Sequence, residues 1–176
     1  DVITGPGNIY VATAKKLVFG EVNIDMIAGP SEIGIIADSH ANSDYLAIDM
    51  LSQAEHDSMA SAILITDNKD LAKEVAQMID TKLTHLMRKD IAQKSIQERG
   101  AIIIVENLKQ AAMLMNAIAP EHLEIVTQEP FSLLGEIKAA GAVFLGHYTP
   151  EAIGDYLAGP NHTLPTGGSA RFFSPL

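Results

Sequence analysis

The sequence contains no cysteine among its 176 residues. This absence excludes disulfide bonds, thiolate nucleophiles and sulfur-ligated zinc. Any bound metal must therefore be held by nitrogen and oxygen atoms, which points to imidazole and carboxylate ligands. The missing cysteines do not by themselves identify a cellular compartment.

Long apolar runs and clusters of basic residues are also missing. No stretch approaches the ~18 to 20 apolar residues that a membrane helix needs, and no export signal is recognisable. The twelve basic residues are scattered, with nothing denser than Lys15-Lys16 or Arg88-Lys89, and the formal net charge is -10. Such a chain repels phosphate backbones. We therefore expect a soluble, cytoplasmic protein that binds neither membranes nor nucleic acid.

Several motifs for phosphate binding and metal-dependent proteolysis do not occur. The chain has no GxxxxGK[ST] loop, which argues against hydrolysis of nucleoside triphosphates, and neither HExxH nor HxxEH. The segment Gly5-Pro6-Gly7-Asn8 precedes an expected helix, so its free amides could meet a phosphate or a carboxylate. Tyr10 nevertheless replaces the third glycine of the dinucleotide fingerprint. On these residues alone, an ordinary turn is the preferred interpretation.

The chain does have an apolar content of 47%, which is enough for a substantial core. Short β-branched runs alternate with helical segments, a pattern typical of an α/β fold with a mostly parallel sheet covered by helices. The expected strands are residues 32–37, 62–66, 101–105, 123–126 and 142–145. The expected helices are residues 9–18, 43–55, 70–86, 90–98, 108–118, 131–139 and 150–157. Thr149 is expected to cap the last of these helices, which directs Asp155 into the following loop.

The pair Glu121-His122 is the most informative chemical feature of the sequence. Pro120 stiffens the approach to the pair and an apolar strand follows it, so we expect both side chains at the rim of the sheet. A carboxylate and an imidazole held side by side can keep their pKa values apart and divide acid and base work. A surface pair of these residue types is an equally good interpretation before any resemblance is considered.

Two further groups of polar residues are weaker candidates when they are taken alone. Gln53 and His56 are three residues apart, so on a helix they share one face and could hold one metal ion, although a solvated polar face is the simpler interpretation. Asp155 and His162 flank Gly159-Pro160-Asn161, where a turn explains the composition without any chemistry.

In their order along the chain, these blocks resemble the histidinol dehydrogenase family. The resemblance covers essentially the whole sequence. It rests on the blocks Gly5-Pro6-Gly7-Asn8, Ile24-Asp25-Met26, Ala28-Gly29-Pro30-Ser31-Glu32, Ser52-Gln53-Ala54-Glu55-His56, Pro120-Glu121-His122-Leu123, Gly154-Asp155-Tyr156 and Asn161-His162-Thr163-Leu164-Pro165-Thr166. It implies two successive NAD-dependent oxidations that convert L-histidinol to L-histidine in a zinc enzyme.

The resemblance also implies roles for individual residues. Gln53, His56 and Asp155 would be zinc ligands that also face the substrate, and the family completes the zinc sphere with a histidine from the partner subunit of a homodimer. Glu121 would activate water, and His122 would take protons and contact the substrate. Ser31 would contact the substrate and Asn8 would contact NAD. His162 matches a position near the substrate, but no role is assigned to it.

The family fold has two Rossmann-like lobes, which implies that the sheet here is incomplete. Residues 1–32 would be the end of the NAD-binding lobe with a connector, and residues 33–176 would be a Rossmann-like segment carrying the zinc and catalytic residues. Because the chain opens without an initiator methionine, we expect an internal fragment that is inactive by itself. Two alternatives remain open: a related zinc- and NAD-dependent dehydrogenase of another amino or sulfonated alcohol, and an inactive α/β binding module.

Overall fold

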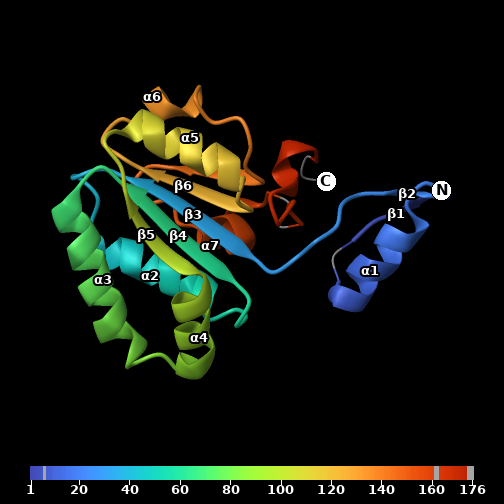
Figure 1. Cartoon of the computed structure of the whole chain (residues 1–176), viewed down its shortest axis with the longest axis horizontal. Coiled ribbons are helices and arrows are strands. Elements are labelled where there is room, and N and C mark those ends of the chain that lie inside the picture. The colour runs from blue at the N-terminus through green and yellow to red at the C-terminus, as the bar shows by residue number, and fades with distance from the viewer. Residues whose placement is uncertain (6, 161–162, 174–176) are drawn as a thin grey trace.

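The computed structural model describes residues 1–5, 7–160 and 163–173. Its main body is a sheet of five parallel strands in the order β5-β4-β3-β6-β7 (Figure 1). The strands are β3 (Glu32–Ala37), β4 (Ser61–Thr66), β5 (Gly100–Ile104), β6 (His122–Val126) and β7 (Ala142–Leu145). This architecture confirms the α/β fold class and the parallel sheet expected from the alternating apolar runs.

Helices cover both faces of this sheet. They are α2 (Ser43–Ala54), α3 (Lys69–Leu83), α4 (Lys89–Arg99), α5 (Leu108–Ile118), α6 (Pro130–Leu134) and α7 (Glu151–Ile153). Figure 1 shows α5 and α6 on one face and α2, α3 and α4 on the other. In the described part of the chain, no helix combines the length and the apolar character needed to cross a bilayer.

The alternation of side chains along β6 decides which way the candidate site faces. Leu123 and Ile125 pack in the core cluster beneath α5, whereas Val126 packs in the cluster beneath α2 and α3. Successive residues of a strand point to opposite faces. His122 and Glu124 therefore share the face that α2 covers, and α7 contacts β6 as well.

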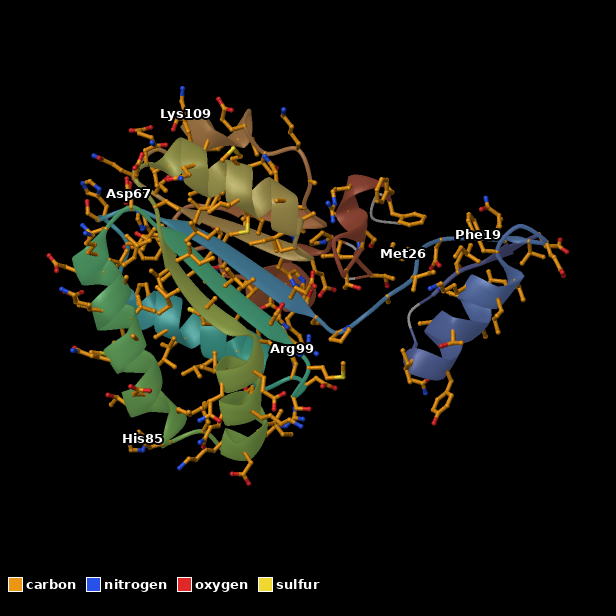
Figure 2. The ribbon with its side chains drawn as sticks, viewed as in Figure 1. Phe19, Met26, Asp67, His85, Arg99 and Lys109 are labelled. Atoms are coloured by element: carbon orange, nitrogen blue, oxygen red, sulfur yellow. The ribbon has the colours of Figure 1, made fainter. Side chains whose placement is uncertain are left out.

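Residues 1–29 contain a smaller unit, which Figure 1 shows apart from the five-stranded sheet. It comprises α1 (Ile9–Val18) and a two-stranded parallel sheet of β1 (Val2–Ile3) and β2 (Asn23–Ile24). Figure 2 shows Phe19 on this unit and Met26 on the extended segment that leads toward β3. The division of the chain into domains at residue 32 stays a prediction.

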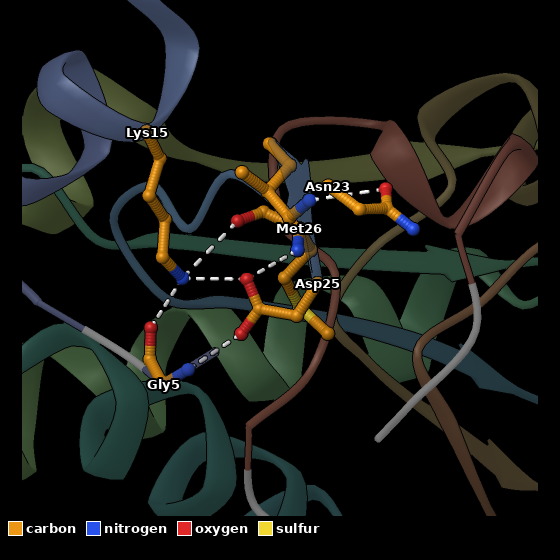
Figure 3. A network of polar contacts seen from close by, with 6 residues as sticks. Gly5, Lys15, Asn23, Asp25 and Met26 are labelled. Carbon is orange, nitrogen blue, oxygen red and sulfur yellow. Dashed lines mark hydrogen bonds and ion pairs between the residues drawn. The ribbon is translucent and has the colours of Figure 1, made fainter. Parts of the chain in front are cut away.

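A buried ion pair holds the small unit together. Lys15 Nζ lies 2.5 Å from Asp25 Oδ1, and the two side chains are 5% and 0% exposed (Figure 3). The other carboxylate oxygen of Asp25 accepts a hydrogen bond from the amide of Gly5 at 2.7 Å, and Lys15 Nζ also donates to the carbonyl of Gly5. The pair thus fixes the peptide of Gly5, immediately before the turn that leads to α1.

Two helices predicted near the C-terminal end differ in length or in helix type from those in the structure. The helix expected at residues 131–139 ends at Leu134, because Asn116 Oδ1 accepts the amides of Lys138 and Ala139 at 2.6 and 3.3 Å, and those amides cannot continue a helix. The segment expected as a helix at residues 150–157 is helical at residues 151–158, but only its first three residues form the α-helix α7, and the π-helical turn η1 (Gly154–Ala158) follows directly.

The expected cap of this last helix is wrong. Thr149 Oγ1 donates to the carbonyl of Leu145 at 2.6 Å instead of capping α7. The amide of Glu151, the first residue of α7, donates to Glu124 Oε1 at 2.8 Å. Glu124 on β6, and not the hydroxyl group of Thr149, therefore caps the start of α7.

Candidate active site

The candidate residues gather at the amino-terminal edge of the five-stranded sheet. Glu121 and His122 lie where β6 begins, and His122 pairs in register with Ile33 at the start of β3. The helix α2 follows β3 and leads back toward the start of β4, so its last turn lies at the same edge. Open parallel sheets usually bind ligands at the carboxyl ends of their strands. This set of residues lies at the opposite edge.

Glu121 is buried behind a rigid approach. Ala119 ends α5 with a left-handed φ of 52°, and Pro120 follows it directly. The carboxylate is 6% exposed and accepts a hydrogen bond from the amide of Glu32 at 3.1 Å. Desolvation by burial raises the pKa of Glu121 to about 7, against hydrogen bonds from the Glu32 amide and the Ser31 side chain. A carboxyl group with that pKa can both accept and release a proton near neutral pH.

The surroundings of His122 define which ring nitrogen is the base. Nδ1 lies 3.2 Å from the carbonyl oxygen of Glu32, which can only accept a hydrogen bond, so Nδ1 carries the proton of the neutral ring. Nε2 then bears the lone pair, and it lies 4.0 Å from Asp155 Oδ1. Desolvation by burial lowers the pKa of His122, against the opposing effect of Asp155. The ring is therefore a neutral base whose Nε2 points toward Asp155.

Asp155 reaches this position through a tightly packed segment. It is the second residue of η1, and the preceding Gly154 lies against the ring of Phe144 on β7. A Cβ atom at Gly154 would lie 2.6 Å from that ring, so only glycine allows this approach without rearrangement. The Asp155 side chain is 26% exposed, which leaves it accessible to a ligand.

Gln53 is the clearest sign that the site accommodates a polar ligand. The residue is 0% exposed at the end of α2, and neither atom of its amide group has a hydrogen-bond partner among the described residues. Leaving a buried polar group unsatisfied typically costs about 1 to 3 kcal/mol. Such groups are rare outside sites that bind a water, an ion or a substrate.

His56 lies just beyond α2, in the turn that begins at the C-terminal capping residue Glu55. Its amide donates to the carbonyl of Gln53 at 3.2 Å, so the chain keeps a helical course between these two residues. The His56 side chain is exposed and close enough to His122 for its charge to lower the pKa of His122. His122 is thus a common neighbour of His56 and Asp155.

These side chains suit a zinc ion. An amide oxygen, an imidazole nitrogen and a carboxylate oxygen are the ligand types available to zinc when cysteine is absent. The unpartnered amide of Gln53 supports this fit independently of the sequence motif. Gln53, His56 and Asp155 thus have the ligand types that zinc takes, but among the described residues the ligand atoms found within 4.8 Å of one another are those of His122, Glu151 and Asp155.

Glu151 is a residue of this site that the sequence reasoning missed. One carboxylate oxygen of Glu151, one ring nitrogen of His122 and one oxygen of Asp155 all lie within 4.8 Å of one another. Burial raises the pKa of Glu151 to about 7, and the charges of Asp155 and Asp49 add to the shift. In the sequence, Glu151 is only an acidic residue in the first turn of an expected helix. Its spacing of four residues from Asp155, which puts both on one helical face, is the signal that could have found it.

Negative charge therefore dominates the site. Carboxyl groups of Glu121, Glu151 and Asp155 lie close to His122, and the charge of Glu32 acts on Glu121. Within the described part of the chain, no lysine or arginine contributes to the pKa shifts of these groups. A cation is the ligand that such a set of charges favours.

Of the remaining predicted site residues, Ser31 lies at the site, Asn8 lies elsewhere, and His162 is not described. Ser31 lies next to Glu121, whose pKa its side chain lowers through a hydrogen bond. Asn8 is exposed on the small unit, where its Oδ1 caps α1 by accepting the amides of Tyr10 and Val11. Figure 1 shows α1 well away from β6. His162 lies outside the described residues.

Comparison with known proteins shows to which family this chain belongs. The family model described as histidinol dehydrogenase matches residues 1–176. The chain belongs to the histidinol dehydrogenase family. Histidinol dehydrogenases of Sulfurimonas denitrificans and Wolinella succinogenes are 66% and 65% identical to it over 176 residues. A crystal structure of histidinol dehydrogenase from Elizabethkingia anophelis superimposes with a TM-score of 0.95 at 40% identity.

All three relatives are longer than this chain. Each alignment covers 100% of the chain but only 41% of the relative. The chain therefore corresponds to well under half of a histidinol dehydrogenase of that length, and it includes the strands, helices and turns that bring Glu121, His122 and Asp155 together.

Proposed function

We propose that this chain forms the metal-holding and proton-transferring part of a zinc- and NAD-dependent enzyme that oxidises L-histidinol to L-histidine in two steps. Membership of the histidinol dehydrogenase family supports the substrate. The observation that carries the mechanism is the orientation of His122, whose unprotonated Nε2 points toward Asp155 while Glu121 stands on its other side.

Gln53, His56 and Asp155 are the proposed zinc ligands, and they also face the substrate. The bound zinc would hold the amine and imidazole of L-histidinol and so orient the alcohol carbon. Because the three side chains do not by themselves fill the four positions usual for zinc, a further ligand is needed. We propose that it is a histidine of the partner subunit in a homodimer.

His122 acts first in the proposed mechanism. Its Nε2 accepts the proton of the alcohol hydroxyl while the carbon gives a hydride to NAD, which yields the aldehyde histidinal and NADH. Burial keeps the imidazole neutral before the step, because desolvation lowers its pKa. The hydrogen bond between Nδ1 and the carbonyl of Glu32 holds the ring plane during the transfer.

Glu121 acts in the second half of the reaction. Its carboxylate takes a proton from a water molecule, whose oxygen attacks the aldehyde carbon to give a hydrate. The proton that His122 took from the alcohol passes to the former aldehyde oxygen as the hydrate forms, which leaves Nε2 free again. His122 then accepts a hydroxyl proton of the hydrate as a second hydride leaves to a second NAD, and the product is L-histidine. The pKa of about 7 at Glu121 matches a group that must accept and later release a proton.

Ser31 is proposed to contact the substrate from its place beside Glu121. Asn8 is proposed to contact NAD. Its Oδ1 is already used to cap α1, so the side-chain amide nitrogen is the atom left for such a contact. A cytoplasmic location is proposed with the same function.

The test uses a protein of the relatives' full length that carries this sequence. Glu121→Gln is expected to keep the first hydride transfer from histidinol and to block the second, so that a single turnover releases one NADH per site. His122→Asn is expected to abolish both. Two NADH per site from Glu121→Gln, or unchanged turnover of His122→Asn, would show that the assigned roles are wrong. Other amino alcohols and sulfonated alcohols in the same assay test the choice of substrate.

A further inference from the structure

Three buried or partly buried carboxyl groups lie two or four residues along the chain from the proposed site residues. Asp49 precedes Gln53 by four residues on α2, and Glu151 precedes Asp155 by four residues across α7 and η1. Glu124 follows His122 by two residues on β6. These spacings put each acid on the same face of its element as the corresponding site residue. Glu151 belongs to the site itself, and Asp49 and Glu124 are acids beside it that the proposed mechanism does not use.

Glu124 interacts with both of the other acids. It is 2% exposed, and its Oε1 accepts the amide of Glu151 at 2.8 Å. The carboxyl groups of Glu124 and of Asp49 on α2 shift each other's pKa through a side-chain interaction, and Oε2 of Glu124 is buried with no other hydrogen-bond partner among the described residues. A hydrogen bond between two carboxyl groups forms only when one of them is protonated and donates. In agreement, burial raises the pKa of Glu124 well above its usual value and that of Asp49 to about 6.

The bond to Glu151 has no substitute in the described part of α7. The N-terminal capping residue of this helix is Pro150, and no side chain of the cap accepts a hydrogen bond. The first amides of a helix have no partner inside the helix. Glu124 supplies the missing acceptor, so a hydrogen bond to this one buried side chain connects the start of α7 to β6.

We propose that Glu124 is a positioning residue of the active site, which joins α2 through Asp49 and α7 through the Glu151 amide to the strand that carries His122. Glu124 thereby sets the separation between His122 Nε2 and Asp155 Oδ1. It also fixes the turn of α2 that carries Gln53. This inference rests on the proposed function, because it assigns Glu124 to the arrangement of that same metal site.

A purely structural role makes a different prediction. A buried hydrogen-bonded group often contributes only about 0.5 to 1.5 kcal/mol to stability, and an apolar group of the same shape can replace it at little cost. If Glu124 only packs, an apolar replacement changes stability alone. If it positions the site, the replacement weakens metal binding, and a residue that keeps the hydrogen bonds restores it.

Two substitutions distinguish the positioning role of Glu124 from a purely structural one. They are made in a metal-free protein that carries this sequence and has the full length of the relatives. Glu124→Gln keeps an oxygen for the Glu151 amide and gives Asp49 a donor. Glu124→Leu removes both bonds at similar size. Ile125→Val, on the opposite face of β6, is the matched control for a disturbed core.

The measurement is the zinc affinity, determined by calorimetric titration with zinc alone. Glu124→Leu is expected to weaken it by about 10- to 100-fold, as is usual when partners behind a metal site are lost. Glu124→Gln and Ile125→Val are expected to bind zinc like the unsubstituted protein. Zinc affinity unchanged in Glu124→Leu, or lost equally in Glu124→Gln, overturns the proposal. If Glu124→Leu does not fold, Asp49→Ala breaks the link to α2 and takes its place in the same comparison.

Hydrogen exchange at the Glu151 amide keeps this inference distinct from the proposed function. In the metal-free protein, exchange should be faster in Glu124→Leu than in Glu124→Gln, and equal rates contradict the positioning role whether or not zinc binds. If the unsubstituted protein binds no zinc, or Asp155→Asn binds it equally well, the proposed metal site fails, and the exchange rates still decide whether Glu124 fastens α7.

Discussion

Glu121 should make the protein less stable as the pH rises, and replacing it with glutamine should remove that loss. Burial raises its pKa from 4.5 to about 7, which is about 2.5 pH units. At about 1.36 kcal/mol per unit, the ionised carboxylate costs on the order of 3 kcal/mol of folding stability. Because the folded-state pKa is the higher one, this cost is absent below pH 4.5, grows as the pH rises toward 7, and is constant above it.

Urea unfolding of the metal-free chain at pH 4.5, 6 and 8 tests this reasoning. Glu121→Gln and the unsubstituted chain should be similar at pH 4.5, because Glu121 is then largely protonated and a glutamine keeps an oxygen for the Glu32 amide. At pH 8 the variant should be more stable by up to about 3 kcal/mol. Glu98→Gln, at an exposed position on α4, is the control for the loss of one negative charge. A variant that is less stable at pH 8, or an advantage that does not change with pH, would refute the assigned burial of Glu121.

Three further predictions concern the ion pair, the proposed metal and the missed carboxylate. Lys15→Met should destabilise the small unit by about 1.5 to 3 kcal/mol, because it removes a hydrogen bond between charged groups, although Asp25 keeps the amides of Gly5 and Met26. An unfolding midpoint equal to that of the unsubstituted chain would count against this contribution. Burial alone raises the pKa of Asp25, but the hydrogen bond from Lys15 and those from the amides of Met26 and Gly5 lower it overall, so this contribution should persist above pH 4 and be lost as the pH falls below about 3.8. Zinc affinity measured by calorimetry should decrease below about pH 6.5, because a histidine ligand must be neutral, and equal affinity at pH 5 and pH 8 would argue against His56 as a ligand. Glu151→Gln should weaken zinc binding by roughly tenfold through the loss of a charge beside Asp155, while Glu129→Gln, an exposed acid before α6, should not.

The elements that the sequence predicted best are those decided by apolar pattern. The strand at residues 32–37 and the helix at residues 108–118 were predicted with the bounds that the structure shows. The local sequence was sufficient there. A strand buried on both faces is a continuous apolar run, and an amphipathic helix has apolar residues three or four positions apart.

The errors arose where distant residues decide the local structure. The helix at α6 was predicted too long because Asn116, on another helix, takes the amides that would extend it. Thr149 was expected to cap α7, but the acceptor at the start of α7 comes from Glu124, 27 residues earlier. Neither contact leaves a signal in the neighbouring sequence.

The candidate site was likewise predicted where local motifs mark its residues and missed where contacts between distant residues decide. The sequence motifs identified Glu121, His122 and Asp155, and the structure brings them together at one edge of the sheet. Glu151 and Glu124 were missed as site residues, because an acid at a helix start or inside a strand has ordinary explanations. Their significance comes from burial and from contacts across three elements, which only the fold reveals.

Anomalous diffraction at the zinc absorption edge, from crystals of a zinc-loaded protein of the relatives' full length that carries this sequence, tests the central claim most directly. The account predicts one strong peak at about 2.0 to 2.2 Å from ligand atoms of Gln53, His56 and Asp155, with His122 nearby but not bound to the metal. A peak held by His122 and Glu151, or one remote from Asp155, would contradict it.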